Sequence, residues 1–269
     1  MDLVVNLIQL VLAGGIIGFI IGLTGVGGGS LMTPFLLWYG IPPATAVGTD
    51  LLYAAITKSN GIAVHHRLGH IHWRAVGSLA ATSLPAAFCT TWILSHWLAT
   101  HGDYSQMIRN ALGFMLLLTG IILLLKPFII SKKITQHKSP AVVDFSSRQL
   151  LILSLVGIPL GSLVALSSVG AGVIGTMLFM IMLPQLSARN VVGTDLAHAV
   201  PLTFVAGISH LMLLNAVDWG LLLSLIIGSL PCVYFGSKAS RYVPDRIMQA
   251  ILAIGLTLIG GYYLYDSFG

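Results

Sequence analysis

Long apolar segments dominate the hydrophobic pattern of this chain. Each has about 17–26 residues and almost no charge: 3–23, 48–64, 73–98, 107–130, 150–168, 190–214, 219–237 and 247–265. A helix of about 20 apolar residues crosses the hydrocarbon core of a bilayer, so all eight segments are long enough to span it. The pattern therefore predicts an all-α, polytopic membrane protein with eight long spans.

Two further apolar segments are too short to cross alone. Residues 30–40 and 174–184 have only about 11 residues each, which is half the length that a spanning helix needs. Each follows a glycine cluster and contains or ends at a proline, a composition typical of helices broken inside a membrane. We expect two broken half-helices.

The chain also contains an internal repeat. The segment Val47–Leu51 (VGTDL) recurs as Val192–Leu196, an offset of 145 residues. The same offset pairs Gly25 with Gly170, Gly27 with Gly172, and His65 with His210. The sequence thus predicts two homologous halves, 1–130 and 150–269, joined by a polar linker at 131–149 that we expect on the cytoplasmic side.

Positive charges favour an inverted arrangement of these halves. If each short segment completes a crossing, each half crosses five times and the second half is inverted. This arrangement places ten basic residues on one face: Arg67, Arg74, Lys132, Lys133, Lys138, Arg148, Arg189, Lys238, Arg241 and Arg246. If the short segments do not cross, the halves are parallel and the positive charges scatter over both faces. The positive-inside rule favours inversion, with both termini outside.

Composition excludes several other classes of protein. Charged residues make up 8% of the 269 residues, the net charge is +5, and the mean hydropathy is +0.94. A soluble domain carries about 25% charged residues. A nucleic-acid-binding surface needs clustered lysine and arginine, which this chain lacks. The two cysteines lie in apolar segments and favour neither a disulfide framework nor a metal site, and we expect no cofactor.

The glycine clusters are candidate anion-binding sites. The first comprises Gly25, Gly27, Gly28 and Gly29, followed by Ser30; the second, at 167–172, contains Gly170 and Gly172. Backbone N–H groups at such a break, together with the positive end of a helix dipole, form a cradle for an anion. Close helix packing through small residues is the alternative. In inverted halves the two cradles face each other near the midplane, where secondary transporters bind substrate.

Polar residues inside the apolar segments are further candidates. Asp50 and Asp195 are equivalent, and an ionisable residue at membrane depth is a candidate for ion coupling. Helix N-capping is the alternative for both. The preceding residues Thr49 and Thr194 offer hydroxyl groups to an oxyanion or act as caps.

Three basic residues, within or at the end of apolar segments, are also candidates. Lys58 is a cation in mid-span that either pairs with an anionic substrate or with Asp50, or snorkels to the membrane surface. His65 and His210 repeat at the same offset and act either as a gate or proton relay or as packing residues.

These motifs together resemble the TauE/SafE (sulfite exporter) family of transporters. The resemblance rests on the GVGGG cluster with Pro34 downstream, the repeated Val-Gly-Thr-Asp, the loop Arg67–Trp73 and the Ser83-Leu84-Pro85 motif, and it covers nearly the whole chain. Two features depart from the family pattern: His72 stands where members often carry an acidic residue, and the second glycine cluster is thinner than the first.

The resemblance implies a multi-pass transporter in the bacterial inner membrane. Its substrates would be small sulfur oxyanions or organosulfonates, moved by an ion gradient such as that of protons. Its partners would be that anion and the lipid bilayer, and a homo-oligomer stays open. A membrane channel or a non-transporting scaffold is the alternative, whereas an enzyme is disfavoured because the sequence has no Ser-His-Asp or HExxH constellation.

Overall fold

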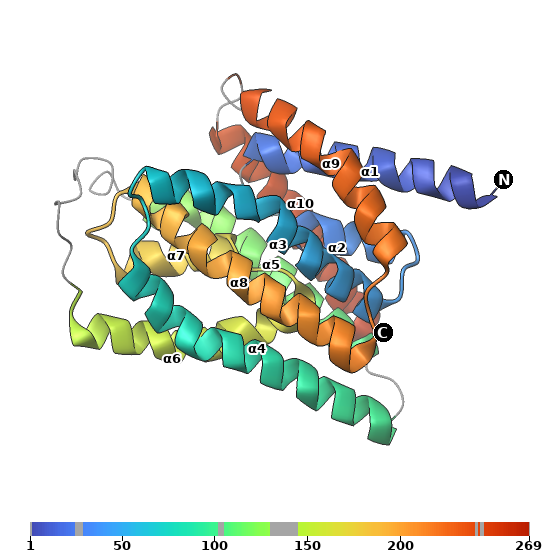
Figure 1. The fold of residues 1–269 in the computed structure, drawn as a ribbon, viewed down its shortest axis with the longest axis horizontal. Coiled ribbons are helices and arrows are strands. Elements are labelled where there is room, and N and C mark those ends of the chain that lie inside the picture. Colours follow the sequence, from blue (N-terminus) through green and yellow to red (C-terminus); the bar gives the residue numbers. More distant parts are fainter. Residues whose placement is uncertain are drawn as a thin grey trace.

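The computed structural model describes residues 2–24, 29–101, 105–129, 145–239, 242 and 245–268. These residues form ten α-helices and no strand (Figure 1). Eight helices are long: α1 (Asp2–Thr24), α3 (Pro43–Arg67), α4 (Trp73–His101), α5 (Ser105–Ile129), α6 (Ser147–Ser167), α8 (Ala188–Leu214), α9 (Trp219–Ala239) and α10 (Asp245–Phe268). Two helices, α2 (Gly29–Trp38) and α7 (Val173–Met182), have ten residues each. The all-α prediction is confirmed, and every predicted apolar segment coincides with a helix.

Six of the described helices are long and apolar enough to cross a membrane. They lie at Trp73–Trp97, Ser105–Lys126, Ser147–Ser167, Ala188–Leu214, Trp219–Ala239 and Met248–Tyr265. Large apolar side chains are exposed along their outer faces, such as Ile227 on α9 and Leu258 on α10, which suits contact with lipid tails. The chain is therefore a multi-pass membrane protein.

Local signals set the start of α6 and the break between α6 and α7. The Ser146 hydroxyl accepts the N–H of Arg148, while the Gln149 side chain accepts the N–H of Ser146, so a capping box begins α6 at Ser147, within the predicted linker. The chain then leaves the helix at Ser168, which has a left-handed φ of 58°. Gly172, with a φ of 137°, precedes α7 and tolerates a backbone angle that other residues rarely adopt.

Most long helices of one half pack against helices of the other half. In the internal repeat, α1 to α5 correspond in order to α6 to α10. The equivalent helices α1 and α6 pack against α9 and α4, respectively. The helices α3 and α5 pack against their own equivalents, α8 and α10. Figure 1 shows α1 beside α9 at the top, α4 beside α6 at the bottom, and α3 and α8 between them. Each of these long helices thus has its main partner in the other half.

Glycines allow the close approach of α1 and α9. A Cβ added to Gly14 or Gly18 of α1 would lie 2.7 Å from the backbone of α9, at Leu225 and Ser229. Small residues of this kind favour association inside a bilayer, where burial of apolar surface against lipid drives helix pairing only weakly.

Two reciprocal hydrogen bonds fix the direction of α3 relative to α8. The Thr49 hydroxyl oxygen accepts the N–H of Asp218 at 3.1 Å, and the Thr194 hydroxyl oxygen accepts the N–H of His72 at 3.1 Å. Thr49 and Thr194 lie near the starts of α3 and α8, whereas His72 and Asp218 follow the ends of these helices. The two equivalent helices therefore run antiparallel.

Candidate functional site

Two carboxylates lie buried in the antiparallel pair of α3 and α8. Asp50 has no exposed surface and Asp195 is 3% exposed. Each lies seven residues after the first residue of its helix, because α3 begins at Pro43 and α8 begins at Ala188. Ser187, which accepts the N–H of Asn190, is the N-cap of α8, and Pro42 precedes α3. The N-capping alternative for both aspartates is therefore wrong.

Each carboxylate faces the short helix of its own half. The Thr33 hydroxyl of α2 donates to Asp50 Oδ2, and Ser168, at the end of α6, lies close to the same carboxylate. Asp195 Oδ1 lies against Gly175 in the first turn of α7, where an added Cβ would overlap it. Among the described residues, Asp50 Oδ1 and Asp195 Oδ1 have no hydrogen-bond partner. A buried polar atom without a partner costs about 1–3 kcal/mol, and a proton or a ligand at either oxygen would offset this cost.

The second glycine cluster presents unused backbone donors. The Gly170 carbonyl accepts the N–H of Ile174 at 3.1 Å, and the Ser167 hydroxyl oxygen accepts the N–H of Val169 at 3.1 Å. Within the described part of the chain, no hydrogen bond occupies the four consecutive N–H groups of residues 170–173, which lead into α7. Consecutive free N–H groups at a helix start are the donors that an anion requires.

The first glycine cluster is described only at its end. Gly25, Gly27 and Gly28 lie outside the described residues, so the predicted first cradle stays a prediction. Gly29 begins α2, and Ser30 in its first turn is buried.

Lys58 of α3 turns inward to the second glycine cluster. Its ammonium group donates to the Ala171 carbonyl at 2.7 Å, which joins the first half to the break before α7. Its strongest electrostatic partner is Asp195, followed by Asp50. The half-buried Lys58 thus belongs to the same polar centre as the two aspartates and does not snorkel to the membrane surface.

The predicted threonine and histidine candidates lie at the interface of the halves. The hydroxyl oxygens of Thr49 and Thr194 are already engaged by the opposite half. His210 is buried, and its Nε2 lies 2.9 Å from the Ala165 carbonyl, so Nε2 carries the donated proton. His65 Nδ1 lies 3.3 Å from His70 Nδ1. These contacts favour structural roles for the four residues.

His72 connects the loop after α3 to α8. Its Nε2 lies 2.8 Å from the Asn190 amide nitrogen, which can only donate. Partial burial lowers the pKa of the His72 imidazole below its usual value, so the ring is neutral at pH 7 and accepts this hydrogen bond.

A second pair of equivalent residues, which the sequence patterns did not predict, lies beside the aspartates. Tyr53 and His198 lie one turn after Asp50 and Asp195, on the same helix faces, and both are buried. His198 Nε2 lies 2.8 Å from the Ser83 hydroxyl. Tyr53 lies beside Ser229, the repeat equivalent of Ser83. The offset of 145 residues that relates Tyr53 to His198 was the signal that could have identified them.

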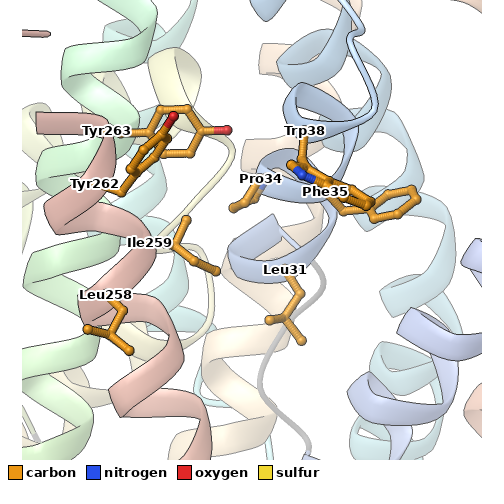
Figure 2. Close-up of a pocket in the computed structure, with 8 residues that line it drawn as sticks. All are labelled: Leu31, Pro34, Phe35, Trp38, Leu258, Ile259, Tyr262 and Tyr263. Carbon is orange, nitrogen blue, oxygen red and sulfur yellow. The ribbon is translucent and has the colours of Figure 1, made fainter. Parts of the chain in front are cut away.

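A separate cavity of about 460 Å³ lies between α2 and α10 (Figure 2). Figure 2 shows Tyr262 and Tyr263 of α10 on one side and Pro34, Phe35 and Trp38 of α2 on the other. Its lining is apolar and aromatic and contains no cation. An anion would lose its hydration there without gaining a cationic partner, so this cavity is poorly suited to an anion.

Comparisons with known proteins agree with the membrane fold. A family model described as "Sulfite exporter TauE/SafE" matches residues 10–263. The chain is 37% identical to a probable membrane transporter protein, YjnA, of Bacillus subtilis over 254 residues, which are 94% of this chain and 98% of the relative. It is 29% identical to a second such protein, YdhB, over 91% of this chain and 95% of the relative. A probable membrane transporter of Methanocaldococcus jannaschii is 22% identical over 95% and 94% of the two chains. No solved structure shows significant similarity.

Proposed function

This chain belongs to the sulfite exporter TauE/SafE family of membrane transporters, and we propose that it is a secondary transporter of small sulfur-containing or organosulfonate anions. We place it in the bacterial inner membrane and infer that a proton gradient drives it. One observation carries the proposal: two buried, equivalent carboxylates each lie against a short helix that begins inside the protein.

Asp195 supplies a physical basis for coupling. An ionised carboxylate at the first turn of α7 is attracted to the positive end of the helix dipole and takes the place that a substrate anion would occupy. Two negative charges at this position repel each other, so protonation of Asp195 favours entry of the anion. Proton and anion then raise each other's affinity, which is the coupling free energy of a proton-linked transporter. Asp50 provides the equivalent group in the first half.

Uptake into proteoliposomes tests this function. The purified chain is reconstituted, and uptake of radiolabelled sulfite and methanesulfonate is measured with and without an imposed pH gradient. A proton-coupled transporter accumulates anion above equilibrium only with the gradient. A channel equilibrates the anion without accumulating it, and a scaffold gives no flux above that of empty liposomes. Either of the last two results contradicts the proposal.

We further propose that the two halves are inverted repeats with both termini outside. The antiparallel course of α3 and α8 and the exchange of partners between α1–α9 and α6–α4 support this topology. Single cysteines at Gln136 and Ser267, in a background in which Cys89 and Cys232 are replaced, should be labelled from opposite faces of the membrane. Labelling of both from one face would refute the topology.

A further inference from the structure

The ammonium group of Lys58 lies beside another positive feature of the protein. Ala171, whose carbonyl binds it, stands two residues before Val173, the first residue of α7. The start of a helix carries about half a positive elementary charge, and the N–H groups of residues 170–173 are free of hydrogen bonds among the described residues. A cation, free N–H donors and a helix start are thus concentrated in one buried region.

One buried polar atom without a partner lies in this region. Asp195 Oδ1 lies against Gly175 in the first turn of α7 and has no hydrogen-bond partner among the described residues. Once protonated, this carboxyl group can donate a hydrogen bond to an anion there. The ionised Asp195 partly balances the positive charge of Lys58 and of the start of α7. The four N–H groups of residues 170–173 still have no hydrogen-bond acceptor among the described residues. An anion bound between Lys58 and α7 would satisfy these donors together.

We propose that Lys58 binds the transported anion jointly with the N–H groups at the start of α7, and that it rests on the Ala171 carbonyl when no anion is bound. This inference deepens the proposed function and rests on it. The ligand is a small oxyanion, because a group with several exposed oxygens, such as sulfite or a sulfonate, can accept from the ammonium group and from backbone N–H groups at the same time.

The two halves differ at this position, which restricts the proposal to one cradle. The repeat equivalent of Lys58 is Thr203, which is buried and donates its hydroxyl to the Ala199 carbonyl at 2.9 Å within its own helix. Among the described residues, no cation from α8 therefore occupies the position equivalent to Lys58, and the lysine lies at the start of α7. We infer that the anion binds at α7 rather than equally at both breaks.

Charge balance links this site to proton coupling. Lys58 carries one positive charge and faces two carboxylates, so this centre is neutral when Asp195 is ionised and Asp50 is protonated. Adding a monovalent anion leaves one excess negative charge in a buried site, which is unfavourable unless Asp195 takes up a proton. The arrangement predicts one proton for each monovalent anion.

Affinity measurements on Lys58 variants test the inference. The full chain is purified in detergent, and binding of sulfite is measured by isothermal titration calorimetry for the wild type, Lys58→Met and Lys58→Arg. We expect Lys58→Met to weaken binding by about 10- to 100-fold, since it removes a charge-assisted hydrogen bond. Lys58→Arg keeps the charge and should bind at least tenfold more tightly than Lys58→Met. Lys238→Met, which removes a cation that lies over the Tyr234 ring on α9, is the matched control and should leave binding unchanged.

The outcomes separate this inference from the proposed function. Equal sulfite affinity in the wild type and Lys58→Met overturns the role of Lys58 and leaves the sulfur-anion function intact. Binding of phosphate or nitrate in place of sulfite, lost in Lys58→Met, overturns the sulfur-anion assignment and supports Lys58. Absence of anion binding by the wild type overturns both. If Lys58→Met unfolds, the comparison of Lys58→Arg with Lys238→Met decides, because a retained charge must retain binding.

Discussion

Replacing Gly175 by alanine should separate the position of Asp195 from the stability of the fold. Gly175 lies in the first turn of α7, and a Cβ at this residue would overlap Asp195 Oδ1. The carboxylate must then move away from the start of α7, where we propose that it competes with the substrate anion. Transport should therefore lose its dependence on the pH gradient.

The effect of Gly175→Ala on stability follows from two opposing terms. Overpacking a buried site costs about 1–3 kcal/mol. Alanine in a helix is favoured over glycine by about 0.8–1 kcal/mol. The free energy of unfolding should thus fall by about 0–2 kcal/mol, a small change beside the expected loss of coupling.

Gly77→Ala is the matched control for this experiment. Gly77 lies within α4, and nothing lies within 4 Å of an added Cβ, so only the helix-propensity term applies and stability should rise by up to about 1 kcal/mol. Thermal unfolding in detergent and gradient-driven uptake in proteoliposomes are measured for both variants. If Gly175→Ala matches Gly77→Ala in both assays, Asp195 has no functional relation to α7 and the reasoning is refuted.

Three further predictions follow from the described contacts. Asp50→Asn and Asp195→Asn should each remove the dependence of anion flux on the pH gradient, because asparagine cannot take up the coupling proton and neither aspartate caps a helix. Unchanged dependence in both variants would show that other residues couple transport to protons. Thr49→Val and Thr194→Val should each lower the free energy of unfolding by about 1–2 kcal/mol. The double variant should lower it by the sum of the two effects, because the two hydrogen bonds lie at opposite ends of α3. Thermal unfolding of the three variants tests this prediction, and a strongly non-additive double variant would contradict it. Gly172→Val should abolish sulfite binding by calorimetry, because Gly172 has a left-handed φ; normal affinity would assign the glycine to packing.

The positions of the helices were predictable because each is marked by a run of apolar residues, which is long for eight helices and short for α2 and α7. The starts of α3 and α8 were harder. The apolar run that predicted α3 begins at Gly48, whereas the helix begins at Pro43, because proline is tolerated in a first helical turn and does not interrupt it. This difference made Asp50 look like a cap when it is interior. For α6, the capping box of Ser146 and Gln149 was present in the sequence and marks the start more closely than hydropathy does.

The candidate site was predictable in its residue types and not in its contacts. The repeat identified Asp50 and Asp195 because both halves keep the carboxylate. It did not predict that Thr49 and Thr194 bind the opposite half, since such contacts depend on which loop the other half presents. The direction of Lys58 was open for the same reason: the Ala171 carbonyl that holds it lies 113 residues away along the chain.

The pairing of α1 with α9 has a consequence for the synthesis of the protein in the cell. The ribosome makes α1 nearly 200 residues before it makes α9, and α4 likewise precedes its partner α6. The glycine-lined face of α1 therefore meets only lipid tails, or an insertion factor, until almost the whole chain has entered the membrane. Assembly of the protein must finish after translation of α9, and a chain that stops after the first half leaves both α1 and α4 without the surfaces against which they pack.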